Sequence, residues 1–193
     1  MCASSTANVT LSDELTFESN EAAYGGVFAF QAPCISFGAD KHWGEQPLVE
    51  PNPVVSLCAG SIVMFANNSA SISGGVGYFE VLEDLIAKPV PNTSTSGFVG
   101  SQVAAAAILV SGGSFHNNTA RENGGVFAFQ ATAGTNDDYL SWDVGVVDSV
   151  FSQNRASQGG ALAMQRGRLS LFNSSFTTSS ACLGGAIYVG QSA

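Results

Sequence analysis

The sequence predicts an all-β fold, a right-handed parallel β-helix (β-solenoid) of about five coils with loop insertions on one edge. Three observations lead to this prediction. A short motif recurs five times, and after each copy apolar and polar residues alternate, as in a strand with one buried face. The shortest spacing between copies, from Phe151 to Phe176, is 25 residues, about one turn of a parallel β-solenoid. The handedness follows from the rule that crossovers between parallel strands are right-handed.

The repeated motif begins with Phe, has Asn three residues later in four copies, and reaches a Gly-Gly pair eight or nine residues after the Phe. Its residues are Phe17, Asn20, Gly25 and Gly26; Phe65, Asn68, Gly74 and Gly75; Phe115, Asn118, Gly124 and Gly125; Phe151, Asn154, Gly159 and Gly160; Phe176, Gly184 and Gly185. The fifth copy has Ser179 in the Asn position. One copy cannot bury its own apolar face, so we expect the copies to stack about 4.8 Å apart, Phe on Phe and Asn hydrogen-bonded to Asn. The glycines fit a sharp corner.

The residues after each glycine pair predict which side chains face inward. When the copies are aligned, residues at the same distance after the glycine pair form a column. The second column holds Phe28, Gly77, Phe127, Leu162 and Ile187, and the fourth holds Phe30, Phe79, Phe129, Met164 and Val189, so both columns are apolar. The odd columns end in Gln31, Glu80, Gln130 and Gln165 and are expected to face solvent. A second strand precedes the Phe in three copies, with apolar pairs such as Ile108 and Val110.

The pairing of Phe-x-x-Asn with Gly-Gly-[Ala/Val]-hydrophobic resembles the repeat of the chlamydial polymorphic outer-membrane proteins. The motifs that carry the resemblance are Phe17/Asn20, Phe65/Asn68, Phe115/Asn118 and Phe151/Asn154, each followed by its glycine pair. The resemblance implies a right-handed β-helix displayed outside the cell as an adhesive passenger domain. We therefore expect an extracellular or cell-surface location, either at an outer membrane or secreted.

Composition narrows the possible partners. The formal net charge is −9 with only six Lys and Arg, so nucleic acid is a poor candidate partner. The longest apolar run, residues 103–110, is far shorter than the roughly 20 residues of a membrane-spanning helix, so no membrane span is expected. We expect residues 1–193 to form one domain, a fragment of a longer solenoid with flanking coils as neighbours.

Three insertions are expected to emerge from one edge as loops, at about residues 32–53, 81–102 and 131–142. They contain aromatic and acidic residues that suit a surface binding glycans or proteins: His42, Trp43, Asp137, Asp138, Tyr139 and Trp142, followed by Asp143. The alternative is that these aromatic residues only pin their loops to the wall of the solenoid.

The cysteines and acidic residues leave further interpretations open. Cys34 and Cys58 could form a disulfide that closes the first insertion, or remain buried free thiols. Asp137 and Asp138 fit a solvated turn better than a calcium site. No metal site or cofactor is expected. Asn-x-Ser/Thr sequons, which permit glycosylation in a eukaryotic secretory route, occur at Asn8, Asn67, Asn92, Asn117 and Asn173.

The predicted function is non-catalytic adhesion or ligand binding. One alternative is a polysaccharide-degrading β-helix enzyme of the pectate lyase or glycoside hydrolase type, for which Asp137 and Asp138 are the only lead. A second alternative is a structural spacer in a surface layer.

Overall fold

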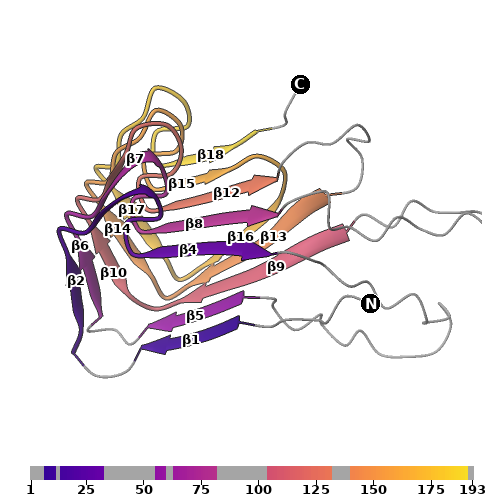
Figure 1. Ribbon diagram of the computed structural model, residues 1–193, viewed down its shortest axis with the longest axis horizontal. Helices are drawn as coiled ribbons and strands as arrows, with labels where there is room; N and C mark the ends of the chain where they lie inside the picture. The colour runs from indigo at the N-terminus through magenta and orange to yellow at the C-terminus, as the bar shows by residue number, and fades with distance from the viewer. Residues whose placement is uncertain are drawn as a thin grey trace, which may run out of the picture.

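The computed structural model describes residues 7–11, 14–32, 55–59, 63–81, 104–131 and 140–190. In these residues there is no helix, and the strands form four parallel sheets, which we number 1 to 4 in the order in which the chain first enters them (Figure 1). Sheets 1, 2 and 4 have five strands each and sheet 3 has three.

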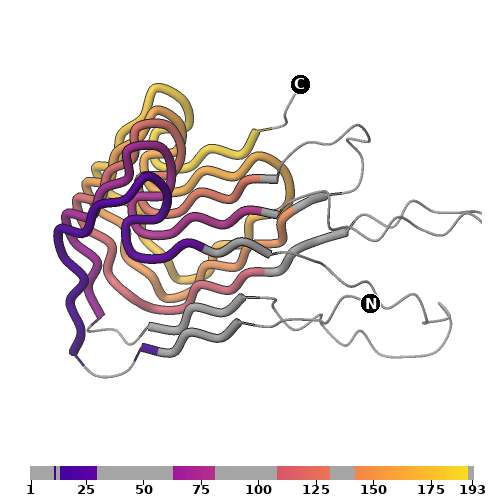
Figure 2. The backbone as a smooth tube through the Cα atoms, viewed as in Figure 1, coloured from indigo at the N-terminus to yellow at the C-terminus, as the bar shows by residue number. Residues whose placement is uncertain are grey.

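We call each stretch that contains one copy of the motif, with the strand before it, a segment. Each of the five segments contributes one strand to sheets 1, 2 and 4, in chain order, and the first three segments also contribute one each to sheet 3. Sheet 1 contains β1 (Ala7–Leu11), β5 (Val55–Ala59), β9 (Ala104–Ser111), β13 (Leu140–Val147) and β16 (Gly167–Phe172). Sheet 2 contains β2 (Thr16–Glu18), β6 (Met64–Ala66), β10 (Ser114–His116), β14 (Val150–Ser152) and β17 (Ser175–Thr177). Sheet 3 contains β3 (Glu21–Tyr24), β7 (Ser69–Ser73) and β11 (Thr119–Ala120). Sheet 4 contains β4 (Phe28–Ala32), β8 (Gly77–Val81), β12 (Phe127–Ala131), β15 (Leu162–Met164) and β18 (Ile187–Val189). Figure 2 shows the segments lying side by side in this order.

The prediction of a single right-handed β-solenoid is wrong, because the strands lie in four separate parallel sheets and none of these sheets closes on itself. Residues in the left-handed region separate the sheets. Residues such as Asp148 (φ 51°) and Asn173 (φ 45°) lie between sheets 1 and 2, and Asn117 (φ 51°) lies between sheets 2 and 3. Such residues turn the chain and interrupt the ladder of hydrogen bonds. The insertions were predicted at about residues 32–53, 81–102 and 131–142. Most of these positions fall in residues 33–54, 82–103 and 132–139, which lie outside the described part of the chain, whereas Ala32, Val81, Ala131 and residues 140–142 lie in strands β4, β8, β12 and β13.

The predicted file of phenylalanines is confirmed in sheet 2. Phe17, Phe65, Phe115, Phe151 and Phe176 occupy one register across β2, β6, β10, β14 and β17. Successive rings are stacked, with centroids 5.0, 4.9, 4.8 and 4.6 Å apart. The three central rings are fully buried. Burial of one such side chain contributes about 1.5–3 kcal/mol, so this file is a main source of stability.

The apolar columns after the glycines also have the predicted register, with Gly77, Phe127, Leu162 and Ile187 in one row of sheet 4. One expectation about the odd columns is wrong. Val76 and Val126, directly after their glycine pairs, are fully buried and belong to the main core. The sharp corner turns Val76 and Val126 toward the interior. Tyr78, Ala128 and Ala163, two positions further along in the odd columns, are also buried, so the alternation fails within the strands as well.

Glycine is required at that corner for two reasons. Gly124 has φ +58°, and a Cβ there would lie 1.9 Å from the Phe127 carbonyl oxygen. A Cβ on Gly125 would lie 2.1 Å from the carbonyl oxygen of Gly160 in the next segment. The first glycine therefore permits the turn and the second permits close stacking, which explains why the pair recurs.

Candidate functional site

Five of the six residues predicted to bind a ligand fall outside the described part of the chain. These are His42, Trp43, Asp137, Asp138 and Tyr139.

Trp142 is described, and the expectation that it is exposed in a loop is wrong. It lies in β13, is only 4% exposed, and packs against Phe129 with ring centroids 5.8 Å apart. Its indole Nε1 is buried without a hydrogen-bond partner. Trp142 is thus part of the core, because the strand of sheet 1 begins earlier than the sequence pattern indicated.

The remaining chemical groups singled out in the sequence are placed only in part. Cys34 lies outside the described residues, and Cys58 lies in β5 with its side chain not described, so their disulfide stays untested. Asp143 lies on β13, where Arg168 of β16 donates from both Nε and Nη2 to its carboxylate. This hydrogen bond, together with the charge of Asp143, raises the pKa of the exposed Arg168. It is a surface ion pair of small energetic weight.

A contact between His116 and Ser152 joins a base to a hydroxyl on sheet 2. Nδ1 of His116 lies 2.8 Å from Oγ of Ser152. Nucleophilic catalysis also needs a third group that orients the base, and the hydrogen bonds of the described residues give His116 no carboxylate partner. The contact is accounted for as a hydrogen bond between neighbouring strands.

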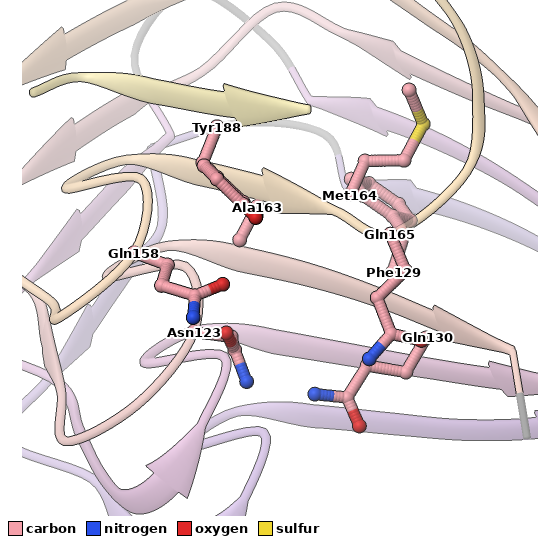
Figure 3. A pocket seen from close by; sticks show the side chains of 8 residues that line it. All are labelled: Asn123, Phe129, Gln130, Gln158, Ala163, Met164, Gln165 and Tyr188. Carbon is pink, nitrogen blue, oxygen red and sulfur yellow. The ribbon is translucent and has the colours of Figure 1, made fainter. Parts of the chain in front are cut away.

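The outer side of sheet 4 carries several carboxamide side chains around a small, shallow hollow. Figure 3 shows this shallow pocket, with the carboxamides of Asn123 and Gln158 on one side of Ala163 and that of Gln130 on the other. Its lining is formed by Asn123, Phe129, Gln130, Gln158, Ala163, Met164, Gln165 and Tyr188. Ala163 lies between these groups. It pairs in register with the larger Tyr188 of the next strand.

Register explains why these groups meet. Gln130 pairs with Glu80 across β12 and β8, and the backbone N–H of Gln165 donates to the carbonyl of Phe129 (3.2 Å). Asn123 and Gln158 are joined by a parallel bridge just before their glycine pairs. Glu80, Gln130 and Gln165 occupy the same position of the repeat and therefore form one row. Asn123 and Gln158 occupy another shared position and form a second row.

Tyr24 is exposed and extends the polar surface toward the first segments, whereas Tyr78 beside it is only 5% exposed. The ring of Tyr78 packs on that of Tyr24, with centroids 4.6 Å apart, and its hydroxyl donates to Oε1 of Gln130 (3.1 Å). Burial, and to a lesser degree the charge of Glu80, raises the pKa of Tyr78. Tyr78 therefore stays a neutral donor at physiological pH.

We call this surface the amide–tyrosine face. It consists of Tyr24, Glu80, Asn123, Gln130, Gln158, Gln165 and Tyr188, and the buried Tyr78 supports it through its contacts with Tyr24 and Gln130. Only Glu80 in this set is charged. Carboxamides and phenols can each donate and accept hydrogen bonds, so the face is suited to a polar, uncharged ligand.

Sequence reasoning found the Gln and Glu column as a solvent-facing row but missed the tyrosines and the pair Asn123 and Gln158. The signal was present. Tyr78 and Tyr188 share the third column after the glycines, with alanines in the copies between them. Asn123 and Gln158 each precede the first glycine of a pair.

No metal is indicated by the side chains that can be placed: among the described residues no three His, Cys, Asp or Glu are grouped to hold one. In the same residues no helix is long and apolar enough to cross a membrane. No protein-family model, curated protein or solved structure matches the chain. The resemblance to the chlamydial repeat therefore stays a prediction.

Proposed function

We propose that the protein is a non-catalytic module of the cell surface or extracellular space that adheres to neutral glycans through its amide–tyrosine face. The supporting observation is the set of four carboxamide side chains, Asn123, Gln130, Gln158 and Gln165, that the register of sheet 4 brings to one surface. Sugar hydroxyls need partners that both donate and accept, and the carboxamide meets this need without charge.

The tyrosines suit the same ligand. A tyrosine offers an apolar ring and a polar tip, which is the combination that amphipathic ligands such as sugars use. The pocket is shallow and lies on a sheet with strands about 4.8 Å apart. An extended chain molecule that makes several weak contacts fits such a surface better than a small ligand that needs enclosure.

The test is a binding measurement with neutral oligosaccharides on an array, followed by calorimetry with the best of them. The double variant Gln158→Ala/Gln165→Ala removes two carboxamides that have no role in the core. If each contributes a typical hydrogen bond of about 0.5–1.5 kcal/mol, Kd should rise about 5- to 150-fold. Thr177→Ala, an exposed change on sheet 2, is the matched control and should leave Kd unchanged.

Two results would overturn the proposal. One is the absence of binding to any neutral glycan, which would favour a spacer or a protein ligand. The other is binding that the double variant leaves intact, which would place the site in the residues outside the described part. Circular dichroism of each variant shows that the fold is retained.

A further inference from the structure

Four of the five sequons lie in the described part of the chain. The side chain of Asn8, in β1, is not described, and the other three asparagines lie on the surface. Asn67, Asn117 and Asn173 are exposed, with Ser69, Thr119 and Ser175 two residues later. Next to the first two stand Asn68 and Asn118, which are fully buried and do not begin a sequon. The acceptor motif thus falls on the outward member of each asparagine pair.

The backbone presents these three side chains on turns. Asn67, Asn117 and Asn173 have φ values of 55°, 51° and 45°, in the left-handed region. A residue in this conformation between two strands points away from the core, and Asn adopts it more readily than other residues with a Cβ. A large substituent on its side chain would extend into solvent without displacing any core residue.

The existing contacts of the three carboxamides are confined to the surface. Nδ2 of Asn67 donates to Glu18 (3.1 Å), Nδ2 of Asn117 to Oδ1 of Asn67 (2.7 Å), and Nδ2 of Asn173 to Asp148 (2.6 Å). Exposed hydrogen bonds of this kind compete with water and contribute little. Substitution of one hydrogen on Nδ2 leaves the second N–H, so the modification removes at most one such bond.

Asn67 and Asn117 are neighbours across adjacent segments, and this limits how many can carry a sugar. Their side chains already touch, and adjacent strands are about 4.8 Å apart. Two sugars attached to both side chains would occupy the same space. One folded molecule can therefore carry a glycan on Asn67 or on Asn117, but not on both.

We propose that Asn173 and one member of the pair Asn67/Asn117 are acceptor sites for N-linked glycans. In the transfer, Nδ2 forms a bond to the anomeric carbon of an oligosaccharide carried on a lipid diphosphate. The bond between that carbon and the diphosphate oxygen breaks, the lipid diphosphate leaves with the electron pair, and the amide loses one proton. The donor is a lipid-diphosphate oligosaccharide supplied by the secretory pathway.

The test is secretion of the chain from a eukaryotic cell behind a cleavable leader, followed by intact mass and peptide mapping before and after glycosidase treatment. We expect a glycan on Asn173 and on one of Asn67 and Asn117 in each molecule. Thr119→Ala, which keeps Asn117 but destroys its sequon, should shift all of the pair's occupancy to Asn67. Ser69→Ala should shift it to Asn117.

Ser152→Ala, which alters no sequon, is the control and should leave the pattern unchanged. Translation with microsomes gives a second measurement that does not depend on secretion. Absence of sugar on all three asparagines in both systems would overturn the proposal. Molecules that carry sugars on both Asn67 and Asn117 while retaining the native circular dichroism spectrum would overturn the exclusion.

Discussion

Two rows of asparagine, one residue apart in the chain, differ in their burial and in their hydrogen bonds. In the inner row, Asn68, Asn118 and Asn154 are fully buried. In the outer row, Asn67 and Asn117 stand one residue earlier in the chain and are exposed. The left-handed turn at the outer residue aims the next side chain into the molecule. Position relative to that turn, not residue type, decides the role of each asparagine.

The inner row forms a continuous ladder of hydrogen bonds. Oδ1 of Asn118 accepts from both the backbone N–H (3.0 Å) and Nδ2 (3.0 Å) of Asn68. Nδ2 of Asn118 donates to Oδ1 of Asn154 (3.1 Å) and to the carbonyl of Phe65 (3.0 Å). The carboxamides of Asn68 and Asn118 thus use both their donors and their acceptor, so the ladder ties neighbouring segments into register. The prediction that the repeated asparagines bond to one another is confirmed.

The largest difference in stability between the two rows is expected when one asparagine of each row is replaced by aspartate. Asn118→Asp buries a group that, when ionised, cannot donate to Asn154 or Phe65. We expect it to lower the free energy of unfolding by about 3–5 kcal/mol at neutral pH. Asn117→Asp in the outer row, where Asp tolerates the turn, should change it by less than about 0.5 kcal/mol.

The pH dependence of the same variant gives a second measurement. Burial disfavours the charged form, so the pKa of Asp at position 118 should be higher in the folded state than in the unfolded chain. The loss of stability should then be smallest below about pH 4, where both states are protonated, and should grow as the pH rises. Denaturant unfolding at several pH values measures this. A pH-independent difference from the wild type would contradict the buried position.

A smaller effect is expected from removal of one carboxamide. Asn118→Ala leaves the backbone N–H and Nδ2 of Asn68 without their acceptor and the carbonyl of Phe65 without this donor. We expect a loss of about 2–4 kcal/mol in denaturant unfolding. Asn117→Gly is the matched control, since glycine accepts the positive φ, and should cost less than about 0.5 kcal/mol. Equal losses in the two variants would show that the rows do not differ.

The smallest expected effect is a gain in stability from extending the ladder beyond Asn154. Ser179 occupies the Asn position in the fifth copy, so the ladder ends at Asn154. By the register of the earlier copies, Asn at position 179 would accept from the N–H groups of Asn154. Ser179→Asn should raise the free energy of unfolding by about 0.5–1.5 kcal/mol. Thr177→Asn, on the exposed side of β17, should give no gain, and a gain from both would assign the effect to something other than the ladder.

The sequence predicted the features that recur in every copy of the motif, because identical residues at the same position of each copy lie side by side when the segments stack in register. The phenylalanine file and the asparagine ladder follow from this. The pattern could not show where one sheet ends and the next begins, since this depends on turns such as the one at Asp148. Alternation fails both at the corners and within the strands of sheet 4, where Val76, Val126 and Ala128 were expected to face solvent and are buried.

The candidate site was predicted less well for a related reason. The sequence drew attention to aromatic residues in the insertions, yet Trp142 packs in the core and the others lie outside the described residues. The amide–tyrosine face is assembled from residues of several segments. Each of them, such as Gln158, is unremarkable alone, and only the register of sheet 4 brings them together.

The most direct test of the buried ladder is hydrogen exchange of the side-chain carboxamides, followed by nuclear magnetic resonance. The account predicts slow exchange at Asn68, Asn118 and Asn154, because opening them requires separation of adjacent segments, and fast exchange at Asn67 and Asn117. Exchange at the same fast rate in both rows would contradict the claim that the inner asparagines hold the segments in register.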